Sequence, residues 1–173
     1  QSFWMKQHDY KTMPIVAFNA VPTKVGAYPQ NFVTEENYRI LAESGINTAY
    51  ALYDKLDLYP DDVIHALEYC EKYGISYVAG LNNSHGQTSA SILEGIIYST
   101  LIKNKPSALG GVIIMDEPAY SNMKDMAASR DCFEELLDKK MYYSGNLFPT
   151  YASEAQLYNR ATGTPTIPEG GYS

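Results

Sequence analysis

Short apolar runs alternate with amphipathic stretches along the first 150 residues of the chain. The apolar runs predict five strands, over residues 13–19, 46–53, 75–82, 110–115 and 141–148. The stretches between them carry apolar residues at helical spacing and predict helices that begin near Thr34, Pro60 and Ser91, with a fourth around residues 126–137. Near-continuous apolar strands that alternate with helices are typical of a parallel sheet covered by helices.

Residues with special backbone roles mark the ends of these elements. Thr34 is a favourable N-cap, and the acidic residues that follow it suit the positive end of a helix. Gly45 and Gly74 are expected to end the first two helices about one strand–helix unit apart. No glycine-rich phosphate loop follows the first strand, which disfavours a dinucleotide-binding fold. The α/β pattern still fits both a (β/α) barrel and an open doubly wound sheet.

The last residues of the chain lack the alternating pattern of strands and helices. Residues 159–173 consist mainly of Gly, Pro and Thr positions that predict a loop or tail. A complete barrel needs eight strands, and we count five, so we expect residues 1–158 to be the N-terminal portion of a (β/α) barrel. Because the chain starts at Gln1 without a methionine, we expect a processed or trimmed product, for which export to the periplasm or beyond is one alternative.

Polar residues follow every predicted strand. They are Asn19, Tyr53, Asp54, Asn82, Asn83, His85, Asp116, Glu117 and Asn146. Because parallel strands bring their C-terminal ends to one rim, we expect these side chains to form a substrate-binding site there. The structural alternative is that Asn and Asp after strands form ordinary turns or helix caps.

Glu117 is the candidate catalytic residue at this rim. It precedes Pro118, and proline favours an extended conformation in the residue before it. By simple alternation Glu117 continues the face of Ile113 and Met115, so we expect an apolar, buried environment that favours a protonated general acid. Asp116 is expected to face the other way and to have a different role. The competing interpretation is that Glu117 caps the next helix.

The composition of the chain limits the classes of partner and cofactor that we expect it to bind. The net charge is −7, and Lys139-Lys140 is the only adjacent basic pair, which disfavours nucleic acid and anionic membranes. No metal-ligand spacing occurs, so neither a metal nor a cofactor is expected. Cys70 and Cys132 are expected to be buried free thiols. The sixteen tyrosines suit sugar-like ligands, although packing between helices and sheet explains them equally well.

Several segments together resemble a known group of proteins. They are Trp4, residues 10–15, 31–38 and 42–47, Asp116-Glu117-Pro118, and residues 146–153. Over about residues 4–158 the chain resembles bacterial glycoside-hydrolase-like barrel proteins related to the β-galactosidase clan of retaining enzymes. The resemblance implies a (β/α)8 barrel that acts on carbohydrate, of which this chain would form a partial TIM-type barrel.

The resemblance also implies roles for particular residues. Glu117 matches the clan's acid/base glutamate after strand four, and Asp116 stands where the clan usually has asparagine. The clan's nucleophile follows strand seven, and no residue of this chain matches it. We therefore expect no turnover by this chain alone, and self-association through the open edges of its sheet. The alternatives are a non-catalytic glycan-binding protein and a complete flavodoxin-like regulatory module with strand order 2-1-3-4-5.

Overall fold

The computed structural model describes part of the chain. The described residues are 13–22, 30–51, 60–80, 104, 106–138, 142–146, 152–153 and 157, and for Ile114, Asp116 and Asn146 only the backbone is described.

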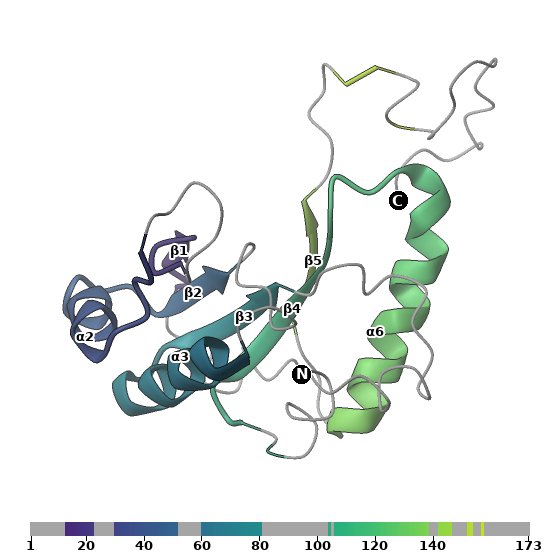
Figure 1. Ribbon diagram of the computed structural model, residues 1–173. Helices are drawn as coiled ribbons and strands as arrows, with labels where there is room; N and C mark the ends of the chain where they lie inside the picture. Colours follow the sequence, from purple (N-terminus) through teal and green to yellow (C-terminus); the bar gives the residue numbers. More distant parts are fainter. Residues whose placement is uncertain are drawn as a thin grey trace.

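A five-stranded parallel sheet forms the centre of the molecule (Figure 1). Its strands are β1 (Val16–Phe18), β2 (Thr48–Ala51), β3 (Ser76–Gly80), β4 (Leu109–Asp116) and β5 (Tyr142–Asn146). Each strand pairs in parallel with the next strand along the chain, in the order β1-β2-β3-β4-β5. The sequential order confirms the partial TIM-type barrel and rules out the 2-1-3-4-5 order of an open flavodoxin-like sheet.

Within the described residues, three α-helices accompany the strands, and their ends follow the signals in the sequence. They are α2 (Glu35–Glu43), α3 (Pro60–Tyr73) and α6 (Met123–Leu137), the last preceded by the short 3-10 helix η1 (Tyr120–Asn122). Thr34 caps α2 by accepting a hydrogen bond from the Asn37 amide. Gly45 and Gly74 follow α2 and α3 with φ of 84° and 69°, which glycine adopts without steric cost. The helix predicted from Ser91 lies outside the described residues.

One face of the sheet packs against the helices and carries the main core. Ala49, Tyr77 and Val112 point to this side and join Leu67 of α3 and Phe133 of α6 in one buried cluster. Figure 1 shows α2 and α3 beside one half of the sheet and α6 beside the other. Cys70 also lies in this cluster, as expected for a buried free thiol, whereas Cys132 is half-buried. Within the described residues, no helix combines the length and the apolarity needed to cross a membrane.

The opposite face of the sheet is curved inward, and we call it the concave face. Its residues, identified by strand register and shared contacts, are Val16, Phe18, Thr48, Tyr50, Val78, Ile113, Tyr142 and Ser144. The Tyr50 hydroxyl of β2 donates a hydrogen bond to Oγ of Ser144 on β5, at 2.5 Å. This bond joins strands that have two others between them, so the sheet must curl like half of a barrel.

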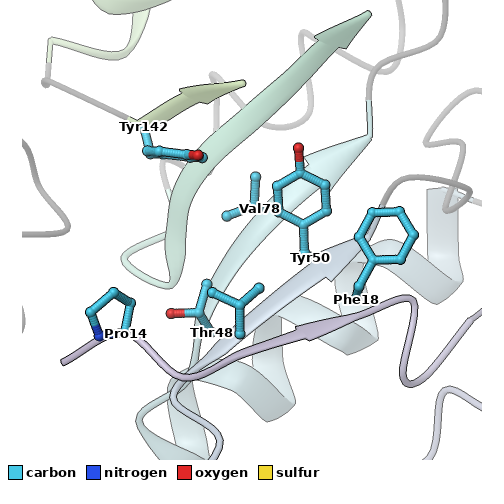
Figure 2. A pocket seen from close by; sticks show the side chains of 7 residues that line it. Pro14, Phe18, Thr48, Tyr50, Val78 and Tyr142 are labelled. Atoms are coloured by element: carbon cyan, nitrogen blue, oxygen red, sulfur yellow. The ribbon is translucent and has the colours of Figure 1, made fainter. Parts of the chain in front are cut away.

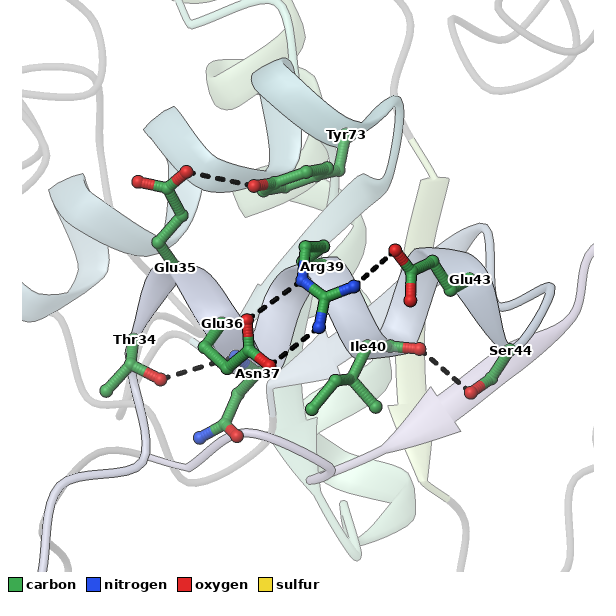
Figure 3. A network of polar contacts seen from close by, with 9 residues as sticks. All are labelled: Thr34, Glu35, Glu36, Asn37, Arg39, Ile40, Glu43, Ser44 and Tyr73. Atoms are coloured by element: carbon green, nitrogen blue, oxygen red, sulfur yellow. Dashed lines mark hydrogen bonds and ion pairs between the residues drawn. The ribbon is translucent and has the colours of Figure 1, made fainter.

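Polar contacts tie α2 to α3 on the outer surface (Figure 3). The Glu35 carboxylate accepts a hydrogen bond from the Tyr73 hydroxyl at 2.9 Å, as Figure 3 shows. It also accepts one from the Lys72 ammonium. Within α2, Arg39 bridges Glu36 and Glu43. Exposed ion pairs of this kind contribute little stability individually, so the buried cluster beneath them is the main source of cohesion.

Candidate functional site

The C-terminal ends of the parallel strands meet at one rim of the half-barrel. Of the residues predicted to form a site there, Asn19 follows β1 and Glu117 follows β4. Asp116 and Asn146 are register partners at the last paired position of β4 and β5. Tyr53, Asp54, Asn82, Asn83 and His85 lie outside the described residues. The structure thus brings the ends of β1, β4 and β5 to the predicted rim.

Asn19 is held tightly where β1 ends. Its backbone N–H donates to the Tyr50 carbonyl oxygen at 2.8 Å, and its φ is 49°. Asparagine tolerates this left-handed conformation better than most residues. The half-buried Asn19 lines a small recess that Tyr38 and Tyr77 also border. Asn19 therefore has a backbone position fixed by the neighbouring strand.

Glu117 adopts a conformation that its sequence context disfavours. Its φ is 46°, so the expectation of an extended residue before Pro118 is wrong. Pro118 is buried beside Gly145, and the Ala119 amide donates to Asn122 Oδ1 at 3.1 Å. These contacts fix the turn after β4 and override the local preference, at a cost of about 1–3 kcal/mol for a left-handed residue other than glycine.

The Glu117 side chain is exposed, so the expectation of an apolar, buried surrounding is also wrong. The reason lies in the pairing of β4 with β5, whose register shifts between Ile113 and Met115. A β-bulge of this kind interrupts the alternation of faces, so counting from Ile113 to Glu117 does not predict the environment of Glu117. Bulges next to strand ends often redirect side chains at active sites.

The structure also contains a cavity that sequence reasoning missed (Figure 2). It has a volume of about 390 Å³ and lies on the concave face. The described residues that line it are Pro14, Val16, Phe18, Thr48, Tyr50, Val78 and Tyr142. The rings of Phe18 and Tyr50 stack there with centroids 5.4 Å apart. A strand sequence that is apolar on both faces does not show which face the helices leave uncovered. The alternate positions 16, 18, 48 and 50 could still have indicated a surface of aromatic and β-branched side chains.

The chemistry available at the rim follows from its described groups. Glu117 is the one carboxylate side chain described there, and no cluster of metal-ligating side chains occurs among the described residues. An exposed carboxylate at a strand end can exchange protons with a bound substrate. Retaining glycoside hydrolysis needs two carboxylates about 5–5.5 Å apart, and among the described residues the rim carries no second carboxylate side chain beside Glu117.

Comparisons with known proteins locate the fold. No family model matches the sequence, and no curated protein sequence matches it. A structural likeness exists to a protein from Bacteroides thetaiotaomicron whose crystal structure is described as that of a putative alpha-L-fucosidase, with a TM-score of 0.51 and 15% identity. The likeness covers 76% of this chain and 51% of that protein, so this chain spans about half of its length. At this identity the likeness shows a shared fold.

Proposed function

We propose that this chain is the N-terminal portion of a (β/α)8 barrel glycoside hydrolase, with Glu117 as the general acid/base. The observation that carries the proposal is the place of Glu117, exposed directly after the fourth strand of a curled parallel sheet. The unfavourable left-handed backbone at this residue supports it further, because strain of this kind accumulates at functional sites.

In the proposed reaction, Glu117 donates a proton to the glycosidic oxygen as the bond to the leaving group breaks. It then takes a proton from the water that completes hydrolysis. The partner carboxylate would come from a later strand of the barrel, as the resemblance to the β-galactosidase clan implies. Asn19 and the other residues that follow the strands would supply hydrogen bonds to sugar hydroxyls.

A first experiment tests turnover. Aryl β-D-galactosides and aryl α-L-fucosides cover the clan resemblance and the structural neighbour, and we expect the 173-residue chain to hydrolyse neither above the buffer rate. Hydrolysis that Glu117→Gln abolishes would overturn the prediction that this chain is inactive alone, while supporting the role of Glu117. Hydrolysis that Glu117→Gln leaves unchanged would contradict that role.

A second experiment tests the location of binding. In an NMR titration with D-galactose and L-fucose, we expect amide shifts at Asn19, Glu117 and Gly145 and none at Ser76 or Leu109, which begin their strands. Glu117→Gln should weaken these shifts, whereas Glu135→Gln, which changes an exposed carboxylate on α6, should not. Shifts confined to the starts of the strands, or no shifts with either sugar, would contradict the proposal.

One observation favours a second candidate, a glycan-binding protein without catalysis. Glu117 is the one carboxylate side chain described at the rim, and a single acceptor can bind a sugar hydroxyl without cleaving the glycoside. A protein that contains the complete barrel and binds oligosaccharides without hydrolysing them would select this alternative.

A further inference from the structure

The turn after β4 places Glu117 between two anchored pieces of backbone. Before it, Asp116 pairs in register with Asn146 of β5. After it, Pro118 is buried, and a Cβ atom on Gly145 would lie 3.6 Å from Cγ of Pro118. Glu117 itself is exposed and has a φ of 46°. A residue other than glycine keeps such a conformation only where the surrounding structure holds it there.

Asn122 anchors the far side of this turn. Because Pro118 has no N–H, the Ala119 amide is the first backbone donor after Glu117. That amide donates to Oδ1 of Asn122 at 3.1 Å, and the Asn122 N–H donates back to the Ala119 carbonyl at 2.9 Å. Ala119 is only 6% exposed, so an amide left unpaired there would be costly to bury. The Asn122 side chain therefore holds the second peptide after Glu117 in one orientation.

The helix that follows holds Asn122 in its turn. Asn122 ends η1 and directly precedes α6, whose Phe133 is only 1% exposed within the core. The first part of α6 also reaches β5, because a Cβ atom on Gly145 would lie 2.7 Å from Cε of Met126. Asn122 thus joins the turn after β4 to a packed helix, and that helix lies against the same glycine as Pro118.

We propose that Asn122 is a positioning residue for the glutamate at the rim, because it fixes the backbone from which the Glu117 side chain extends. Its importance for catalysis rests on the proposed function of Glu117, whereas its effect on the backbone does not. Without this acceptor, residues 117–119 can return to the extended conformation that a residue before proline favours, and the carboxylate then extends from the rim in another direction. Catalytic groups lose much of their effect when they are displaced by about 1 Å.

NMR of the 173-residue chain tests the backbone and the response to sugar separately. A positive φ brings the amide and α protons of a residue close together, so Glu117 should give a strong NOE between them. Asn122→Ala should weaken this NOE. It should also raise the Kd for D-galactose or L-fucose, followed by the shift of the Glu117 amide, about fivefold, as the loss of one capping hydrogen bond implies. Asn122→Asp keeps an oxygen that can accept from the Ala119 amide and should restore both signals.

The control removes a matched cap from another helix. Thr34 accepts from the Asn37 amide at 3.3 Å at the start of α2, so Thr34→Ala should lower Tm by a similar amount and leave the NOE and the sugar response of Glu117 unchanged. A second variant, Asn122→Gln, moves the side-chain oxygen by one methylene and should act like Asn122→Ala. Circular dichroism establishes that the variants remain folded.

The possible outcomes separate this role from the proposed function. A Glu117 NOE that stays strong in Asn122→Ala and Asn122→Gln would overturn the proposal, as would an equal loss of the NOE in Thr34→Ala. If the NOE weakens as expected but the unsubstituted chain shows no shifts with either sugar, the positioning of Glu117 by Asn122 is supported and only the proposed function is contradicted.

Discussion

The hydroxyl of Tyr50 on β2 donates to Oγ of Ser144 on β5 across the concave face, at 2.5 Å. In a flat sheet these two strands would stand roughly 14 Å apart, since each step between neighbouring strands is about 4.8 Å. A tyrosine and a serine side chain cannot span that separation. The hydrogen bond is therefore direct evidence of curvature, and it connects residues that are 94 positions apart in the sequence.

Removing this hydrogen bond should destabilise the fold moderately. We expect Tyr50→Phe to lower the free energy of unfolding by about 1 kcal/mol, with a coupling to Ser144→Ala of about 0.5–1.5 kcal/mol in a double-mutant cycle. Tyr142→Phe, at an exposed tyrosine of the same face, should change the free energy by less than about 0.5 kcal/mol. Urea denaturation measures the unsubstituted protein, the two single variants and the double variant of the cycle, and Tyr142→Phe, and a coupling of zero would contradict this account of the curvature.

A side chain at Gly111 should separate β4 from β5. A Cβ atom there would lie 2.5 Å from the Tyr142 carbonyl oxygen and 2.9 Å from the Tyr142 Cβ. We expect Gly111→Ala to cost about 1–3 kcal/mol and to shift the amide signals of β5. Gly45→Ala meets no atom within 4 Å but forces alanine to a φ of 84°, so it should cost about 1 kcal/mol and leave β5 unchanged. Equal β5 shifts in both variants would refute the steric explanation.

The Tyr143 hydroxyl should be dispensable. It is buried without a hydrogen-bond partner among the described residues, and burial raises the pKa of Tyr143 well above its ordinary value. Tyr143→Phe removes an unsatisfied polar group, so we expect the free energy of unfolding to stay the same or to rise by up to about 1 kcal/mol. A clear loss of stability in thermal unfolding would show that the hydroxyl has a partner after all.

The Cys70 thiol should be unreactive in the folded protein. It is fully buried on the inner side of α3, and burial first, then the nearby Glu71 carboxylate, raises the pKa of Cys70. In a Cys132→Ser protein, which isolates this thiol, we expect no reaction with Ellman's reagent at pH 8 until denaturant unfolds the chain. Rapid reaction under native conditions would place Cys70 at the surface and contradict the packing of α3.

The contact between α2 and α3 should make stability depend on acid pH. The hydrogen bond from the Lys72 ammonium, followed by the one from Tyr73, lowers the pKa of Glu35. A lowered folded-state pKa means that this contribution is complete above the ordinary glutamate pKa and is lost as the pH falls through the folded-state value. Lys72→Met should raise the Glu35 pKa measured by carboxyl NMR and reduce the loss of stability between neutral and acid pH. An unchanged Glu35 pKa would contradict the contact.

The order of elements was predictable because local signals and the fold agree. Thr34, Gly45 and Gly74 mark helix ends by their own backbone and hydrogen-bonding preferences, and each does so in the structure. Among the described residues, the predicted strands begin one to three residues before β1, β2 and β3, because apolar residues precede the first paired position. The choice between a barrel and an open sheet depends on which strands pair, and the periodicity of apolar residues does not show the order of the strands in the sheet.

The geometry at Glu117 was not predictable, since two contacts between distant elements decide it. The register shift in β4 depends on how β5 pairs with it, and the packing of Pro118 beside Gly145 places a residue before proline in the left-handed region. Neither the alternation of strand faces nor the proline rule includes such partners. The exposure of Phe18 and Tyr142 was not predictable for the same reason. An apolar pattern indicates that residues favour burial, but it does not show whether another element covers them.

The sequential strand order has a consequence for synthesis on the ribosome. Each new strand pairs only with the one before it, so a nascent chain can extend the sheet without waiting for a distant segment. By residue 80, the strands β1, β2 and β3 and the helices α2 and α3 have already been made. The protein can thus begin to assemble from its N-terminus, with the face that packs against the helices buried before the concave face.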